Sequence, residues 1–88
     1  MNSHDMLLTF PCQFPIKIIG KASDAFEIKA LSILRQYVPE LKENALKVQT
    51  SKQGHYISMT VTILAQNQEQ LDNIYRELSS DPDVLMAL

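Results

Sequence analysis

The residues from Gly54 to Gln66 alternate between apolar and polar side chains over a longer stretch than any other part of the chain. One side of this run carries Ile57, Met59, Val61 and Ile63, and the other carries Tyr56, Ser58, Thr60 and Thr62. Successive side chains of a β-strand point to opposite faces, so this period of two predicts a strand with one buried and one hydrated face. The fold is therefore expected to contain a sheet that is covered on one side only.

Length and composition limit the remaining choices. A chain of 88 residues is expected to form one domain, residues 1–88, around a single modest core. An apolar fraction of 45% argues against disorder, and a net charge of -2 gives no support for nucleic-acid binding through bulk electrostatics. No signal peptide and no apolar run of membrane-spanning length are recognisable. We therefore expect a soluble, cytoplasmic protein without a membrane partner.

The first half of the chain predicts an arm, a strand and a helix. Residues 1–13 are expected to form an N-terminal arm, in which Pro11 prevents a helix. Alternating apolar residues predict a strand over Phe14–Gly20. A helix is predicted to follow, with Ser23 as its N-cap and its end near Val38, because a proline comes next.

The second half predicts a hairpin, a helix and a last strand. Leu46 to Thr50 alternate, and the short loop after them ends in Gly54, whose left-handed conformation would close an antiparallel hairpin. Asn67 is placed to cap a second helix, with Gln70 as its capping-box partner. Residues 83–88 predict a fourth strand. The expected alternation places Val84, Met86 and Leu88 on one face of this strand. Leu85 and Ala87 are then on the other face.

The predicted order β-α-β-β-α-β and the single apolar stripe on each helix favour one architecture. It is an α+β, ferredoxin-like sandwich, with a four-stranded antiparallel sheet, the first and third strands central, and both helices on one face. Lys17 and Ile19 are then expected on the uncovered face with the polar side of the third strand. Lys47 and Gln49 would join them from an edge strand.

This uncovered face is the first candidate for function. Exposed surfaces and free sheet edges on small domains often bind partners. The candidate interaction residues are Lys17, Tyr56, Ser58, Thr60 and, on the first helix, Ile28, which lies opposite the buried stripe. RNA-binding domains of this topology stack bases on several aromatic rings, whereas this face offers Tyr56 as its one ring. We therefore expect a protein partner or a second copy, and no nucleic acid.

The loop between the first strand and the first helix is the second candidate. Backbone amides at a helix N-terminus attract anions, so Gly20, Lys21, Ser23 and Asp24 are the expected residues of a small-anion site. A single glycine does not make a phosphate-binding fingerprint, which requires several at fixed spacing. The alternative is an ordinary capped loop.

Residues with catalytic or metal-binding chemistry are few. His4 and His55 are the two histidines, and no spacing of His, Cys, Asp or Glu supplies the convergent ligands of a metal site. Cys12 is the single cysteine, and it has no basic neighbour in sequence that would lower the pKa of a nucleophilic thiol. We expect surface histidines, an inert thiol, no catalytic residues, no metal and no cofactor.

The chain resembles the YbeD-like family of small bacterial proteins along nearly its whole length. The matching residues are Phe10, Pro11, Phe14, Lys17, Gly20, Ser51, Lys52, Gly54, Tyr56, Ser58, Tyr75, Glu77, Leu78, Val84, Met86 and Leu88. The resemblance implies a ferredoxin-like fold close to that of ACT-type regulatory domains, in a cytoplasmic protein. ACT domains bind small effectors at the loop between the first strand and first helix, which in this sequence corresponds to Gly20 through Asp24.

These observations lead to a predicted function of limited detail. We expect a non-enzymatic regulatory or protein-interaction module, acting on a partner or as a dimer. The alternative is an ACT-like sensor that binds an amino acid or a similar anion at the loop. A third hypothesis, an acylphosphatase-like enzyme, requires an arginine in that loop, where this chain has Lys21.

Overall fold

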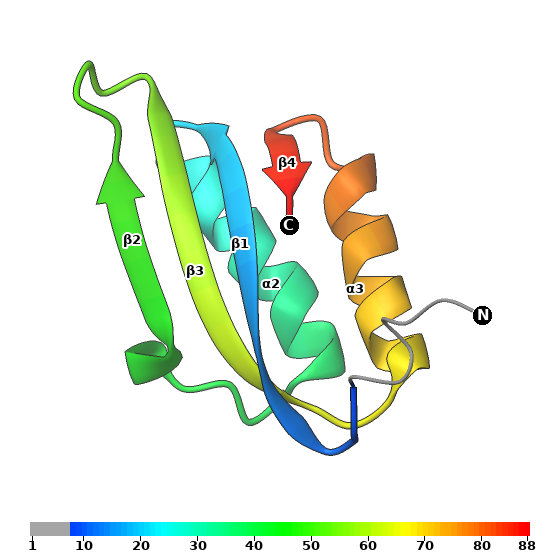
Figure 1. The fold of residues 1–88 in the computed structure, drawn as a ribbon. Helices are drawn as coiled ribbons and strands as arrows, with labels where there is room; N and C mark the ends of the chain where they lie inside the picture. Colours follow the sequence, from blue (N-terminus) through cyan, green and yellow to red (C-terminus); the bar gives the residue numbers. More distant parts are fainter. Residues whose placement is uncertain (1–7) are drawn as a thin grey trace.

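The computed structural model of the chain describes residues 8–88. The first seven residues of the predicted arm, His4 among them, lie outside the described residues. The elements are β1 (Cys12–Lys21), α2 (Asp24–Tyr37), the short 3₁₀ helix η1 (Glu43–Ala45), β2 (Leu46–Thr50), β3 (Tyr56–Ala65), α3 (Gln68–Ser80) and β4 (Val84–Ala87). Both α-helices lie on the same side of the sheet (Figure 1). The predicted α+β, ferredoxin-like order is confirmed.

The sheet has the strand order β2-β3-β1-β4, and every neighbouring pair is antiparallel. β1 and β3 are central and pair along their full length, from Cys12 opposite Ala65 to Lys21 opposite Tyr56. β1 begins at Cys12, two residues before the predicted start. The reason is that β3 continues to Ala65 and offers backbone partners to the last two residues of the predicted arm.

The hairpin between β2 and β3 closes as predicted. Gly54 has a φ of 74°, in the left-handed region that favours glycine, and its N–H donates to the Ser51 carbonyl over 2.9 Å. The Ser51 N–H in turn donates to the Tyr56 carbonyl over 2.9 Å. These bonds set the register in which Lys47 lies opposite Thr60.

Helix α2 begins and ends at the predicted residues. The Ser23 hydroxyl accepts a hydrogen bond from the Phe26 N–H over 3.1 Å, and so satisfies one of the free amides of the first turn. The Val38 N–H donates to the Leu34 carbonyl over 2.8 Å at the other end. The loop from β1 therefore leads directly into a capped helix.

Helix α3 is capped by Asn67, whose Oδ1 accepts from the Gln70 N–H over 2.8 Å. The second half of the capping box differs from the prediction. The Gln70 side chain accepts from the Gln66 N–H over 2.7 Å and donates to the Tyr37 carbonyl over 2.9 Å. It therefore joins the start of α3 to the end of α2, a contact between elements that local sequence rules do not contain.

The core lies between the sheet and the two helices. All four apolar residues of the predicted third strand are buried, which confirms the alternation from which the fold was inferred. The core consists of Ile16, Ile18, Phe26, Ala30, Leu34, Val38, Ile57, Met59, Val61, Ile63, Ala65, Leu71, Ile74 and Leu78. Within the described part of the chain no polar or charged side chain is buried. We call this side of the sheet the covered face.

The predicted alternation of the last strand is wrong. Val84 lies opposite Gly20, but Met86 lies opposite Ile19, because β4 carries an extra residue, Leu85, at an irregularity in the pairing. An extra residue in one strand shifts every later side chain to the other face of the sheet. Val84 therefore packs against the core, whereas Met86 does not.

Candidate functional site

The side of the sheet that faces away from α2 and α3 is the uncovered face. Alternate residues of all four strands form it together with Leu88, whose backbone exchanges hydrogen bonds with Lys17 over 3.0 and 2.8 Å. The register places these side chains on it: Gln13, Pro15, Lys17, Ile19 and Lys21 from β1, Lys47 and Gln49 from β2, Tyr56, Ser58, Thr60, Thr62 and Leu64 from β3, Met86 from β4, and Leu88. The four sheet residues predicted to form an interaction face, Lys17, Tyr56, Ser58 and Thr60, are all among them.

Large apolar side chains on this face remain accessible to solvent. The exposed fractions are 49% for Tyr56, 43% for Leu64, 50% for Met86 and 60% for Leu88. Isolated exposed apolar residues are common on proteins, but several on one face of a sheet indicate a contact area. Near the hairpin the face is hollowed by about 240 Å³, between Ile19, Gln49 and Tyr56.

Several of these residues were not identified from the sequence. Leu64 follows Thr62 in the same phase of the alternation, so it could have been assigned to this face. Met86 could not, because the irregularity at Leu85 reverses its side. The same irregularity moves Leu88 to this face, whereas the predicted alternation placed it on the same side as Val84.

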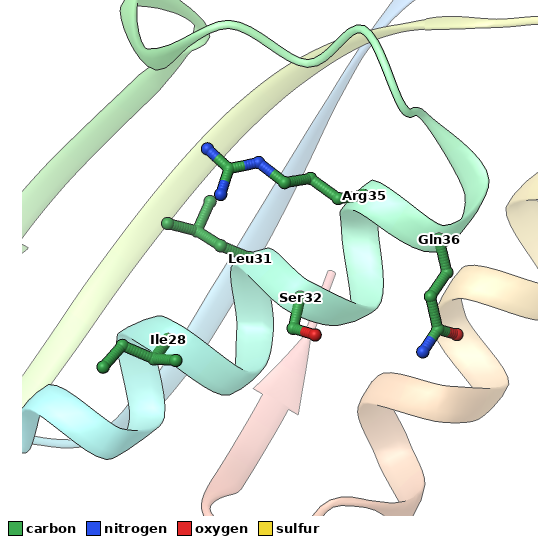
Figure 2. A pocket seen from close by; sticks show the side chains of 5 residues that line it. All are labelled: Ile28, Leu31, Ser32, Arg35 and Gln36. Carbon is green, nitrogen blue, oxygen red and sulfur yellow. The ribbon is translucent and has the colours of Figure 1, made fainter.

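The fifth predicted contact residue, Ile28, lies elsewhere. It is 67% exposed on α2 and borders a shallow hollow of about 430 Å³, which is formed entirely by that helix. Figure 2 shows its lining side chains: Ile28, Leu31, Ser32, Arg35 and Gln36. Since α2 belongs to the helical layer, the structure does not bring Ile28 together with the uncovered face.

The residues of the predicted loop site are adjacent in the chain but have different surroundings. A hollow of about 330 Å³ lies beside the loop, but of the four predicted residues only Lys21 lines it, with Ala22, Gly54, His55 and Tyr56. We call this the loop hollow. The Ser23 hydroxyl is engaged in capping α2, and Asp24 is exposed in its first turn.

Gly20 is buried and has a packing role. A Cβ atom at this position would lie 2.4 Å from Cε1 of Phe26 and 2.6 Å from the Asp83 carbonyl oxygen. The φ of Gly20 is not positive, so its requirement for glycine comes from this close approach and not from its backbone conformation. The absence of a side chain at Gly20 therefore allows β1 to pack closely against α2 and the segment before β4.

Titratable groups with shifted pKa values lie in the helical layer. Lys29 Nζ is 2.8 Å from Asp83 Oδ2, and this hydrogen bond, with the charges of Asp81 and Asp83, raises the pKa of Lys29. Partial burial raises the pKa of Tyr75 on α3. Tyr37 donates a hydrogen bond to the Glu77 carboxylate between the two helices. None of these groups borders the uncovered face.

Residues with catalytic potential do not converge. Over residues 8–88 there is no group of three or more His, Cys, Asp or Glu side chains that could hold a metal ion. His55 is exposed, with its ring centre 6.4 Å from that of Tyr56. Cys12 is half-buried against the core. No helix in the described range has the length and hydrophobicity needed to cross a membrane.

Comparison of the sequence with protein families gives a match over residues 5–88 to the family described as "Protein of unknown function (DUF493)". The chain belongs to this family. A UPF0250 protein of Nitrosomonas europaea is 41% identical over 98% of this chain and 99% of its own length. A UPF0250 protein of Janthinobacterium sp. is 40% identical, over 100% of this chain and 97% of its own length. The YbeD-like resemblance is thereby confirmed.

Two solved structures are similar to this fold. The solution structure of protein HP0495 from H. pylori has a TM-score of 0.75 at 22% identity and covers 100% of this chain and 94% of its own. The ACT domain from a GTP pyrophosphokinase of Chlorobium tepidum has a TM-score of 0.59 at 12% identity, covering 88% of this chain and 97% of its own. At these identities the likeness concerns the fold, which is ACT-like as the family resemblance implied.

Proposed function

We propose that this member of the DUF493 family is a non-catalytic regulatory or interaction module that binds a partner protein through the uncovered face. The observation that carries the proposal is the exposure of Tyr56, Leu64, Met86 and Leu88 on one side of the sheet. A helix or strand laid over this side would bury them, as α2 and α3 bury the covered face. The hydrophobic gain is about 25 cal/mol per Å² of apolar surface removed from water.

The chemistry of the described residues supports a role without catalysis. The core contains no polar or charged side chain, so it provides no desolvated acid, base or nucleophile of the kind that active sites use. The shifted pKa values belong to Lys29 and Tyr75, outside the uncovered face. Binding without chemistry requires only surface, and the uncovered face supplies it.

The proposal is tested by capture of binding proteins from a lysate with matched variants. Met86→Glu introduces a charge among the apolar residues of the uncovered face, on β4, whereas Ile28→Glu introduces the same charge on the helical layer. We expect a protein captured by the original chain to be lost with Met86→Glu and retained with Ile28→Glu. Equal capture by both variants, with both folded by circular dichroism, would contradict the proposal.

A second copy of the chain is the other occupant to examine. Sedimentation velocity over a wide concentration range distinguishes a monomer from a dimer. A dimer that dissociates with Met86→Glu would identify self-association as the function of the face. A monomer at high concentration leaves a different protein as the partner.

The loop hollow favours a second candidate function, an ACT-like sensor of an amino acid or a similar anion. Its support is a cavity of about 330 Å³ beside the exposed Lys21, in a fold similar to an ACT domain. A ligand at 100 times its Kd would stabilise the protein by about 2.7 kcal/mol. Thermal shifts against amino acids and small phosphates test this candidate, with Lys21→Ala expected to abolish the shift. An unchanged melting temperature at millimolar ligand would exclude it.

A further inference from the structure

The strands of the described residues carry lysines but no acidic residue, whereas the helices carry charges of both signs. The whole chain has 10 Asp and Glu against 8 Lys and Arg, a slight negative excess. The uncovered face nevertheless carries three lysines, Lys17, Lys21 and Lys47, and within residues 8–88 no Asp or Glu belongs to any strand. The acidic residues of this range lie on the helices and on the connections between elements. The sheet layer is therefore basic, although the protein as a whole is acidic.

The three lysines are free to meet a partner. Lys17 and Lys47 lie on either side of Thr60 in one row across the sheet, and Lys21 lies opposite Tyr56. Neighbouring strands are about 4.8 Å apart, so the backbones of Lys17 and Lys47 are separated by about 10 Å. All three side chains are exposed, and none forms an ion pair within the described residues.

The apolar side chains adjoin these lysines. Met86 lies opposite Ile19, and Leu88 pairs with Lys17 through its backbone. The face thus combines an aliphatic area towards β4 with positive charges on β1 and β2. Complementary surfaces in protein complexes match both features, with charge contributing to specificity and to the rate of encounter.

We infer that the partner presents an acidic segment with apolar side chains to the uncovered face. This inference rests on the proposed function and names the partner's chemistry. A second copy stacked face to face would set Lys17, Lys21 and Lys47 against the same lysines. Single-stranded nucleic acid binds through several stacked rings, and this face has Tyr56 alone.

The experiment uses the whole protein, labelled with ¹⁵N, and two synthetic helical peptides. Both peptides carry the same stripe of leucines, flanked by glutamates in one and by lysines in the other. We expect the glutamate peptide to shift amide signals of β1, β3 and β4, with an affinity that falls as salt is added. The Kd of the lysine peptide is expected to be about tenfold higher, a difference in binding free energy of about 1.4 kcal/mol.

Charge reversal provides the matched control. The double variant Lys17→Glu and Lys47→Glu changes exposed residues and is expected to reverse the preference in favour of the lysine peptide. Arg35→Glu changes an exposed basic residue on α2, in the helical layer, and is expected to leave the preference unchanged. Equal binding of both peptides, binding of neither, or no response to the double variant would overturn the inference. Tighter binding of an oligouridylate than of the glutamate peptide would assign the face to nucleic acid instead.

Capture with the double lysine variant separates failure of the acidic-partner inference from failure of the proposed function. A captured protein that is lost with Met86→Glu but retained with the double lysine variant would preserve the interaction module and overturn its acidic partner. Loss with both variants supports both statements. Association of the labelled protein with itself, reversed by salt, would identify the acidic helical layer of another copy as the occupant and overturn the assignment to a different protein.

Discussion

The two sides of β3 share one backbone and differ in almost every other respect. Met59 and Val61 are fully buried under the helices, whereas Tyr56 on the other side of the same strand is 49% exposed. Strand propensity does not distinguish the two faces, because alternate residues of the same strand form them. The difference arises from α2 and α3, which cover one face only. The covered face therefore determines stability, and the uncovered face is available for binding.

Two methionines provide the sharpest test of this comparison. Met59 is fully buried and Met86 is 50% exposed, so the same substitution removes the same atoms from opposite faces. Met59→Ala is expected to lower the free energy of unfolding by about 2–5 kcal/mol, through lost burial and a residual cavity. Met86→Ala should change it by less than about 0.5 kcal/mol. Urea denaturation measures both, and similar losses would show that the uncovered face also packs.

Gly20 tests whether the loop before α2 is built for packing or for a ligand. Gly20→Ala places a methyl group 2.4 Å from the Phe26 ring and is expected to cost about 1–3 kcal/mol of stability. Gly54→Ala is not a suitable control because its φ is positive, so Ala22→Ser, an exposed change in the same loop, serves instead. A stable Gly20→Ala protein would mean that Phe26 can move away at little cost.

Ser23 gives a smaller effect of the same kind. Ser23→Ala removes the acceptor of the Phe26 N–H and should destabilise the protein by about 1 kcal/mol. Ser23→Asp retains an acceptor and should restore most of the loss. If Ser23→Ala left the melting temperature unchanged but abolished a ligand-induced shift, its role would be recognition and not capping.

Tyr75 gives the smallest effect and a defined pH dependence. Partial burial raises the pKa of Tyr75 above its ordinary value of 10.0, since the neutral phenol is favoured in the helical layer. The folded state then holds this proton more tightly than the unfolded chain does. Stability from this group is complete below pH 10 and is lost as the pH rises through the raised value. Tyr75→Phe should flatten the fall in stability above pH 10. An identical fall in both proteins would assign it to other groups.

Much of the fold could be predicted from local signals. The strand over Tyr56–Ala65, the caps Ser23 and Asn67 and the glycine turn at Gly54 depend on residues a few positions apart, and all are found as expected. The site was less predictable. The face was identified through β3, but its apolar part near β4 was not, because a single extra residue at Leu85 decides which side Met86 occupies.

The sequence by itself determined the elements and the one-sided character of the sheet, because period and capping are properties of neighbouring residues. The tertiary structure alone decided which distant residues meet. It placed Lys47 and Lys17 on either side of Thr60, engaged Gln70 with Tyr37, and filled the space above Gly20 with Phe26. Pairing register and packing between elements depend on the whole chain closing around one core, and no short segment contains that information.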